Sequence, residues 1–170
     1  MWPFQEPIGV QAVPNPFNSM EFRQALGSFA TGVTIVTTLG KNGEKVGMTV
    51  NSFNSVSLDP PLILWSLDRK TNCFDDFVDA ESFAVHVLAA EQQDLSQRFA
   101  SVGKDRFHDL ECSQGLSGTP ILPQCSAYFE CTSEHLYEGG DHVILVGRVV
   151  NFVDNQLPPL LFYRGQYNTL

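Results

Sequence analysis

Positive charge is scarce in this sequence. Lys and Arg number 10 against 19 Asp and Glu, which gives a formal net charge of −9 over 170 residues. Such an acidic chain is not attracted in general to nucleic acid or to an anionic membrane, so we expect neither as a partner. No apolar run approaches the ~20 residues that span a bilayer, and the N-terminus lacks the basic and apolar segments of a signal peptide. Any anion must therefore bind at a local site.

Metal-binding spacings are missing as well. The four cysteines, Cys73, Cys112, Cys125 and Cys131, show no CxxC pattern, and the four histidines form no HxxxH or Cys/His pair. We therefore expect no metal site and a reduced, cytoplasmic protein, with disulfides left open as an alternative.

Nucleotide-binding and hydrolase motifs are also absent. The chain has no GxGxxG after a predicted strand, no GxxxxGK[ST] and no GxSxG. Dinucleotide or triphosphate binding through such loops is thus not expected, and acyl-transfer chemistry has little support.

The chain length fits one domain with its own core. Residues 1–18 contain four prolines and predict an extended N-terminal arm, whereas residues 19–170 form the predicted single domain. Trp2, Phe4 and Phe17 in the arm need something to pack against, and a partner subunit is one candidate.

Helical spacing and β-branched runs alternate along the domain. Ser19 is the expected cap of a helix that ends at Thr31-Gly32, and shorter helices are expected after residues 69–72, capped by Thr71 or Asn72, and over residues 91–101. Strands are predicted over residues 32–40 and 45–58, joined by an Asn42-Gly43 turn, and over residues 62–67, 82–89, 126–137, 142–153 and part of 160–167. In residues 126–137 the odd-numbered side chains from Ala127 to Tyr137 are expected on the buried face, and residues 142–153 are expected to be enclosed on both sides. Six or seven strands joined mostly by hairpins favour a closed or nearly closed antiparallel barrel with peripheral helices.

A run of neutral polar residues, TVNSFNSVS, occupies residues 49–57. Hydroxyls and amides without Lys or Glu suit the edge of a planar, uncharged heterocycle. An equally good interpretation is that these side chains satisfy neighbouring backbone groups.

Two basic segments are candidate anion sites. Arg69 and Lys70 precede Thr71, Asn72 and a predicted helix, an arrangement that suits a phosphate, although a basic pair in a turn is usually only solvated. Residues 104–107 (KDRF) form a second basic segment that can approach the same anion from another loop.

Histidine supplies one further candidate. His142 follows Gly140 and Asp141 at the start of a predicted strand, where it can donate a hydrogen bond or relay a proton near neutral pH, although a turn histidine is more often structural. His86, inside an apolar strand, is expected to be a hydrogen-bonded core residue.

Four segments together closely resemble the short-chain flavin reductase family: residues 29–37 (FATGVTIVT), residues 47–61 (GMTVNSFNSVSLDPP), Gly140-Asp141-His142 with Gly147, and residues 159–165 (PLLFYRG). The resemblance extends from about residue 20 to the C-terminus. It implies a mainly β, antiparallel split barrel that binds FMN or FAD, usually as a homodimer. It also implies hydride transfer from NADH or NADPH to the flavin, which members commonly supply to a separate monooxygenase. A non-catalytic flavin- or haem-binding split barrel is the alternative.

The resemblance also implies roles for individual residues. Thr49, Val50, Asn51 and Ser52 match the flavin-ring segment, Ser66 and Leu67 flank the ribityl chain, and Arg69, Thr71, Asn72 and Cys73 lie near the phosphate. Phe99, Lys104, Arg106 and Phe107 match a second phosphate and flavin loop, although His108 and Asp109 stand where the family often has glycine. His142 matches the family histidine beside the flavin and nicotinamide, and Arg164 and Tyr167 are expected to close the pocket.

Overall fold

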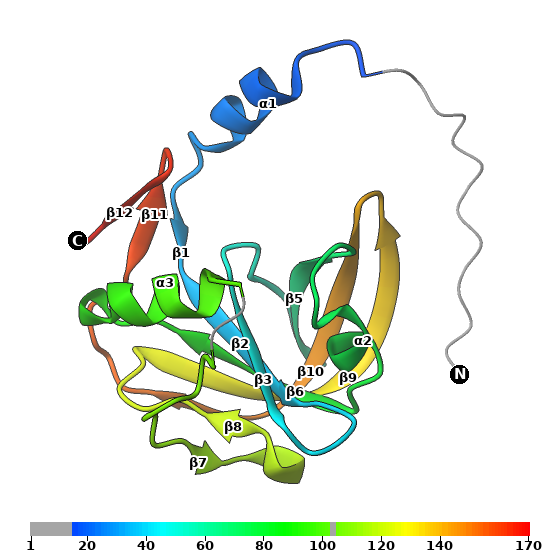
Figure 1. Ribbon diagram of the computed structural model, residues 1–170, viewed down its shortest axis with the longest axis vertical. Coiled ribbons are helices and arrows are strands. Elements are labelled where there is room, and N and C mark those ends of the chain that lie inside the picture. The colour runs from blue at the N-terminus through cyan, green and yellow to red at the C-terminus, as the bar shows by residue number, and fades with distance from the viewer. Residues whose placement is uncertain (1–14, 103–104) are drawn as a thin grey trace.

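The computed structural model of this protein describes residues 15–102 and 105–170 (Figure 1). Most of the predicted arm, with Trp2 and Phe4, lies outside the described residues, and so does Lys104.

Antiparallel strands dominate the structure. The main sheet has the order β3-β2-β6-β9-β10-β5-β4, and every pairing is antiparallel. Its strands are β2 (Thr34–Leu39), β3 (Lys45–Val50), β4 (Asn54–Leu58), β5 (Pro61–Asp68), β6 (Ser82–Val87), β9 (Ala127–Gly139) and β10 (His142–Asp154). Two small sheets join β1 (Thr31–Gly32) with β11 (Leu161–Tyr163) and β12 (Gln166–Asn168), and β7 (Ser113–Gln114) with β8 (Pro120–Ile121). The predicted mainly β, antiparallel fold is confirmed.

Helices are few and lie at the periphery (Figure 1). They are α1 (Ser19–Leu26), α2 (Phe74–Val78) and α3 (Gln93–Ala100), with short 3₁₀ helices η1 (Ala90–Gln92) and η2 (Leu116–Gly118). Among the described residues, no helix has both the length and the apolar character needed to cross a membrane.

A three-residue crossover, residues 51–53, connects the two edges of the main sheet. Strand β3 pairs with β2 at one edge and β4 pairs with β5 at the other, so the single strand predicted over residues 45–58 is wrong. A flat sheet of seven strands would separate its edge strands by roughly 29 Å, since neighbours lie ~4.8 Å apart. The four peptide steps from Val50 to Asn54 span at most ~15 Å, so the sheet must curl. The architecture is therefore compatible with the predicted split barrel.

The β2–β3 hairpin confirms the predicted Asn42-Gly43 turn. Gly43 has φ +79°, which glycine adopts without strain, and the Gly40 amide donates to the Glu44 carbonyl at 2.8 Å.

A β-bulge changes the facing of side chains along β9. Val146 pairs with His135 but Gly147 pairs with Ser133, so Glu134 is the extra residue. Beyond this bulge Leu136 packs against the core and His135 is exposed. The predicted alternation therefore fails after Ser133, and it also fails at Glu130, which is buried although it was expected on the polar face.

The second half of β10 is open to solvent. Val150 is 51% exposed and Phe152 63%, so the prediction that both faces are enclosed is wrong for this half. Residues before Arg148 on the same strand, such as Val143 and Leu145, are buried as expected.

Two apolar clusters form the core. One surrounds Trp65, with Phe77 and Phe83 packed edge-on to it, and the other contains Phe99 and Leu160. His86 lies in the core as predicted: its Nδ1 is 3.0 Å from the Ile35 carbonyl, and its Nε2 is 3.1 Å from the Leu122 amide.

The helix caps differ from those predicted. The Asn18 side chain accepts from the Met20 amide at 2.7 Å, so Asn18 rather than Ser19 caps α1. Cys73 occupies the cap position of α2, where no described side chain makes the cap hydrogen bond expected of Thr71 or Asn72. None of the residues of α1 is buried within the described structure, and the helix stands away from the main sheet in Figure 1.

Candidate functional site

A cleft of about 460 Å³ lies between β3, the turn before α2 and the loop after α3. Its described lining residues are Glu44, Lys45, Val46, Gly47, Lys70, Thr71, Asn72, Cys73, Asp76, Val102, Asp105, Arg106 and Phe107. The structure thus brings together described parts of the two segments that were expected to approach one anion: Lys70 to Asn72 of the first, without Arg69, and residues 105–107 of the second.

The turn before α2 presents polar groups to the cleft. Lys70 and Asn72 are exposed, and the Thr71 hydroxyl lies 3.5 Å from Sγ of Cys73. Lys45 reaches the cleft from β3 with its Nζ 5.9 Å from the centre of the Phe107 ring. An ammonium group beside hydroxyl and amide donors is the chemistry that binds a phosphate.

Arg106 ties its loop to β3. Its guanidinium donates to the Ser101 carbonyl at 3.1 and 2.8 Å and to the Gly47 carbonyl at 2.5 Å. Phe107 packs edge-on to Phe99, with ring centroids 5.0 Å apart. These contacts fix the second loop along one wall of the cleft.

Three predicted cofactor residues have buried side chains. Leu67 and Phe99 are both 0% exposed, and Val50 is buried as well. Their side chains support the walls of the site by packing and offer no surface to a ligand.

In the polar segment of residues 49–52, two side chains bind backbone groups and one is exposed to solvent. The Thr49 hydroxyl donates to the Ser96 carbonyl at 2.7 Å. The Ser52 hydroxyl accepts from the Ser66 amide at 2.9 Å and lies 3.3 Å from the Ser66 carbonyl. Asn51 is exposed, and its side chain makes no hydrogen bond to a described residue. The alternative in which these groups satisfy backbone thus holds for Thr49 and Ser52, while Asn51 is available to a ligand.

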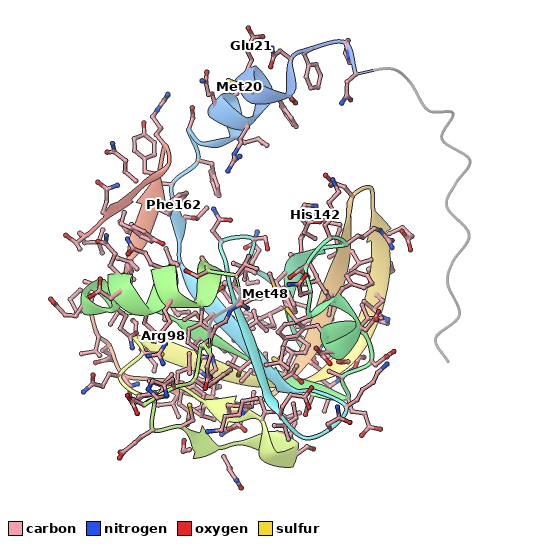
Figure 2. The ribbon with its side chains drawn as sticks, in the orientation of Figure 1. Met20, Glu21, Met48, Arg98, His142 and Phe162 are labelled. Carbon is pink, nitrogen blue, oxygen red and sulfur yellow. The ribbon has the colours of Figure 1, made fainter. Side chains whose placement is uncertain are left out.

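His142 begins β10 near the tip of the β9–β10 hairpin (Figure 2). Its side chain is 40% exposed, and its Nδ1 is 2.7 Å from Oδ1 of Asp141. This hydrogen bond holds the pKa of the Asp141 carboxyl below its ordinary value. Because a carboxylate only accepts, Nδ1 carries a proton and Nε2 is directed to other partners.

The remaining predicted residues lie outside the described lining of the cleft. Arg69 pairs with Glu138 on β9. The Tyr167 hydroxyl is 2.8 Å from that of Ser96. Arg164 donates to Ser28 at 3.0 Å, which ties the β11–β12 hairpin to the end of α1.

Sequence reasoning missed several residues of the cleft, among them Lys45 and Gly47. Lys45 carried no recognisable signal, because a single lysine at the start of a strand is ordinary. Gly47 was part of the motif of residues 47–61, but its close contact with two rings depends on helix α3 and the following loop.

Cys73 places a thiol at the cleft, with the sulfur of Met48 behind it. Sγ of Cys73 lies 4.0 Å from Sδ of Met48, and Cys73 is partly exposed. Cys125 and Cys131 are buried instead, and burial raises the pKa of each thiol to about 12.

The fold and the cleft define a class of protein: a curled antiparallel sheet whose cleft carries charged and hydrogen-bonding groups from two loops. The chain belongs to the flavin reductase like domain family, whose model matches residues 26–170.

Named relatives agree with this membership. The chain is 44% identical over 149 residues to the reductase component of the flavin-dependent trigonelline monooxygenase of Acinetobacter baylyi, covering 88% of this chain and 48% of that protein. It is 45% identical over 155 residues to the FMN reductase (NADH) SmoA of Agrobacterium fabrum, covering 91% and 88%. The chain spans about half the length of two of its relatives, the Acinetobacter protein and a probable flavin reductase of Rhizobium meliloti (49%).

Solved structures share the architecture. The Streptomyces globisporus NADH:FAD oxidoreductase SgcE6, in complex with NAD and FAD fragments, superposes with a TM-score of 0.86 at 35% identity, covering 94% of this chain and 97% of that one.

Proposed function

We propose that this protein is an NAD(P)H-dependent flavin reductase that transfers hydride to FMN or FAD and supplies the reduced flavin to a partner monooxygenase. The observation that carries the proposal is the cleft in which residues 70–73 meet Arg106 and Phe107. Relatives named as an NADH-dependent FMN reductase and as a monooxygenase reductase component support it.

The donor set of the cleft fits a flavin phosphate. Lys70 and Lys45 supply positive charge, and Thr71 and Asn72 supply a hydroxyl and an amide. Charge-assisted hydrogen bonds from such groups are the strong contacts that hold a phosphate in place. In this arrangement Arg106 holds the loop, since described carbonyls already accept from all three of its guanidinium nitrogens.

The crossover supplies the contacts for the ring. Asn51 presents an amide with both donors and an acceptor to the edge of a heterocycle, while Ser52 fixes the crossover on β5 through Ser66. A bound flavin would supply the hydride-accepting ring. The chain's own contribution is to hold the two rings in reacting geometry, which is the main source of rate in such reactions.

His142 is the proposed catalytic residue. Asp141 fixes the proton of its imidazole on Nδ1, so that Nε2 can accept a hydrogen bond or a proton at the active site. We assign it to the nicotinamide side of the site.

A second copy of the chain is the proposed partner of α1. Phe22 and Leu26 on this helix are exposed, and an isolated helix of eight residues is not stable in water. A homodimer would cover this apolar face. We place the protein in the cytoplasm as a single domain over residues 19–170 preceded by an arm.

The experiment is a rate comparison with purified full-length protein. NADH or NADPH is mixed with FMN, FAD or riboflavin, and the loss of absorbance at the visible maximum of the flavin is followed. A rate equal to that without protein would contradict the proposal. A coloured ligand that co-purifies without nicotinamide oxidation would favour the non-catalytic alternative.

A comparison of FMN with riboflavin, which lacks the phosphate, tests whether the cleft binds the phosphate. Lys70→Gln should raise the KM for FMN about 10-fold or more, since a hydrogen bond to a charged group is worth at least about 1.5 kcal/mol, and it should leave the KM for riboflavin unchanged. Lys41→Gln is the control, because Lys41 pairs with Asp79 at 2.8 Å outside this cleft. Equal effects of both variants would remove Lys70 from the phosphate site.

A further inference from the structure

Arg69 contacts the β9–β10 turn from three directions. Its guanidinium pairs with the Glu138 carboxylate on β9, and its Nε donates to the Gly140 carbonyl at 3.3 Å. Its backbone amide donates to the Asp141 carbonyl at 3.1 Å. One residue therefore binds the strand before the turn and both central residues of the turn.

The turn that Arg69 holds is the one that presents His142. Gly139 pairs with His142, and Gly140 and Asp141 form a two-residue loop between them. Gly140 has φ +75°, as glycine does at the first central position of a type II′ turn. The orientation of the imidazole depends on this short loop, because its Nδ1 bonds to the side chain of Asp141.

Strand pairing brings Arg69 to this place. His142 pairs with Asp68, the last residue of β5, so the next residue along the chain leaves the sheet beside the turn. The guanidinium carbon of Arg69 also lies 5.8 Å from the centre of the Phe74 ring, which supports the side chain from below. The position of Arg69 is thus fixed by the pairing of β5 with β10 and by the contact with Phe74 of α2.

Arg69 is turned away from the cleft of the phosphate site. The described lining of that cleft begins at Lys70 on this segment and does not include Arg69. Two of its guanidinium nitrogens, Nε and Nη2, are directed to groups of the hairpin. The Arg69 side chain thus binds the β9–β10 hairpin, although it is next in sequence to the residues that line the cleft.

We propose that Arg69, together with Glu138, is a positioning residue that holds the Gly140-Asp141 turn so that His142 faces the active site. Its effect on turnover rests on the proposed function, whereas its effect on the turn does not. Misplacing a reacting group by about 1 Å costs on the order of 10²-fold in rate, so a clamp on a two-residue turn matters for catalysis.

The test compares Arg69→Gln, Glu138→Gln and the double variant in the full chain. The first readout is hydrogen exchange of the ligand-free protein over residues 136–144, where we expect faster exchange in all three. The second readout compares turnover with FMN binding. We expect kcat to fall about 10-fold, while the FMN dissociation constant, measured by fluorescence quenching, changes less than about 2-fold. The double variant should be no worse than the more affected single variant, because both remove the same contact.

The matched control is another ion pair on the same hairpin. Arg148 donates from Nε to Glu134 at 3.0 Å, between β10 and β9 but away from the turn. Arg148→Gln and Glu134→Gln should leave exchange over residues 136–144 and kcat unchanged.

Two results would overturn the proposal. One is unchanged exchange at the turn in Arg69→Gln. The other is a loss of FMN affinity with unchanged riboflavin affinity in Arg69→Gln, together with a silent Glu138→Gln, which would make Arg69 a phosphate ligand. If the wild-type protein shows no turnover at all, the proposed function fails, and the exchange data still decide the role of Arg69 at the turn.

Discussion

Gly47 lies directly against the ring of Phe99. A Cβ on Gly47 would stand 2.7 Å from Cε1 of Phe99 and 3.1 Å from Cζ of Phe107, closer than carbon atoms approach without a shift. The carbonyl of the same glycine accepts from Arg106. Glycine at this position therefore lets β3, α3 and the loop of the second basic segment meet at one point.

Gly47→Ala should destabilise the fold and loosen the cleft together. Phe99 is completely buried and cannot yield, so we expect a loss of ~1–3 kcal/mol in the free energy of unfolding, as for overpacked cores. The displaced loop should also weaken FMN binding. Urea unfolding and fluorescence quenching measure the two effects. Gly32→Ala is the control, because a Cβ at Gly32 meets nothing within 4 Å.

Asn51→Ala should weaken flavin binding, whereas Ser52→Ala should mainly lower stability. The exposed Asn51 amide lacks a described partner, so its loss should weaken flavin binding by ~1–3 kcal/mol without changing stability. The Ser52 hydroxyl binds the Ser66 backbone, so its loss should cost ~1 kcal/mol of stability first. Binding titrations and thermal unfolding separate the two. Unchanged affinity in Asn51→Ala would mean that the ring lies elsewhere.

His142→Ala should lower turnover more than flavin affinity. We expect kcat to fall roughly 10- to 100-fold, toward the lower end of the range for a lost proton-transfer group, with FMN affinity nearly unchanged. Steady-state rates with NADH and equilibrium titration with FMN test this. The reverse pattern would assign His142 to flavin binding.

His86 should make the fold sensitive to acid. Burial lowers its pKa from 6.5 to about 4. Between pH 4 and 6.5 His86 is therefore protonated in the unfolded chain but neutral in the folded protein. The contribution to stability is complete above pH 6.5 and is lost as pH falls toward 4; at 1.36 kcal/mol per unit it amounts to about 3 kcal/mol. Urea unfolding at pH 7, 5.5 and 4 measures it. His86→Gln, which does not titrate, should be less stable at pH 7 but should lack this part of the pH dependence.

Short stretches of sequence were enough to predict the features that depend on a few neighbouring residues, such as a turn or the burial of one side chain. The Asn42-Gly43 pair predicted its hairpin because glycine adopts positive φ without strain, and the position of His86 in an apolar strand predicted its burial. The bulge at Glu134 was not predictable, since it arises from the pairing of β9 with β10. The break at residues 51–53 likewise reflects the closing of the sheet, which no short window of sequence contains.

The candidate site divides in the same way. Lys70, Thr71, Asn72 and Arg106, which line the cleft, were expected from their charge and hydrogen-bonding groups, whereas Cys73 was expected only from the family resemblance. The engagement of Arg69 with the hairpin was missed, because it depends on the pairing of Asp68 with His142, 74 positions apart in the chain. Side-chain chemistry thus identified segments that line the cleft, and strand pairing decided which neighbour each group contacts.

The Cys73 thiol at the cleft gives the protein a built-in reporter of ligand occupancy. Cys73 is partly exposed beside Thr71 and Asn72, whereas Cys125 and Cys131 are sealed in the interior with thiols that stay protonated at neutral pH. An alkylating reagent applied to the native protein should therefore modify Cys73 well before either interior thiol, and a nucleotide seated over the turn should shield it. The rate of mass gain on that one peptide then measures saturation of the cleft without any absorbance or fluorescence of the ligand.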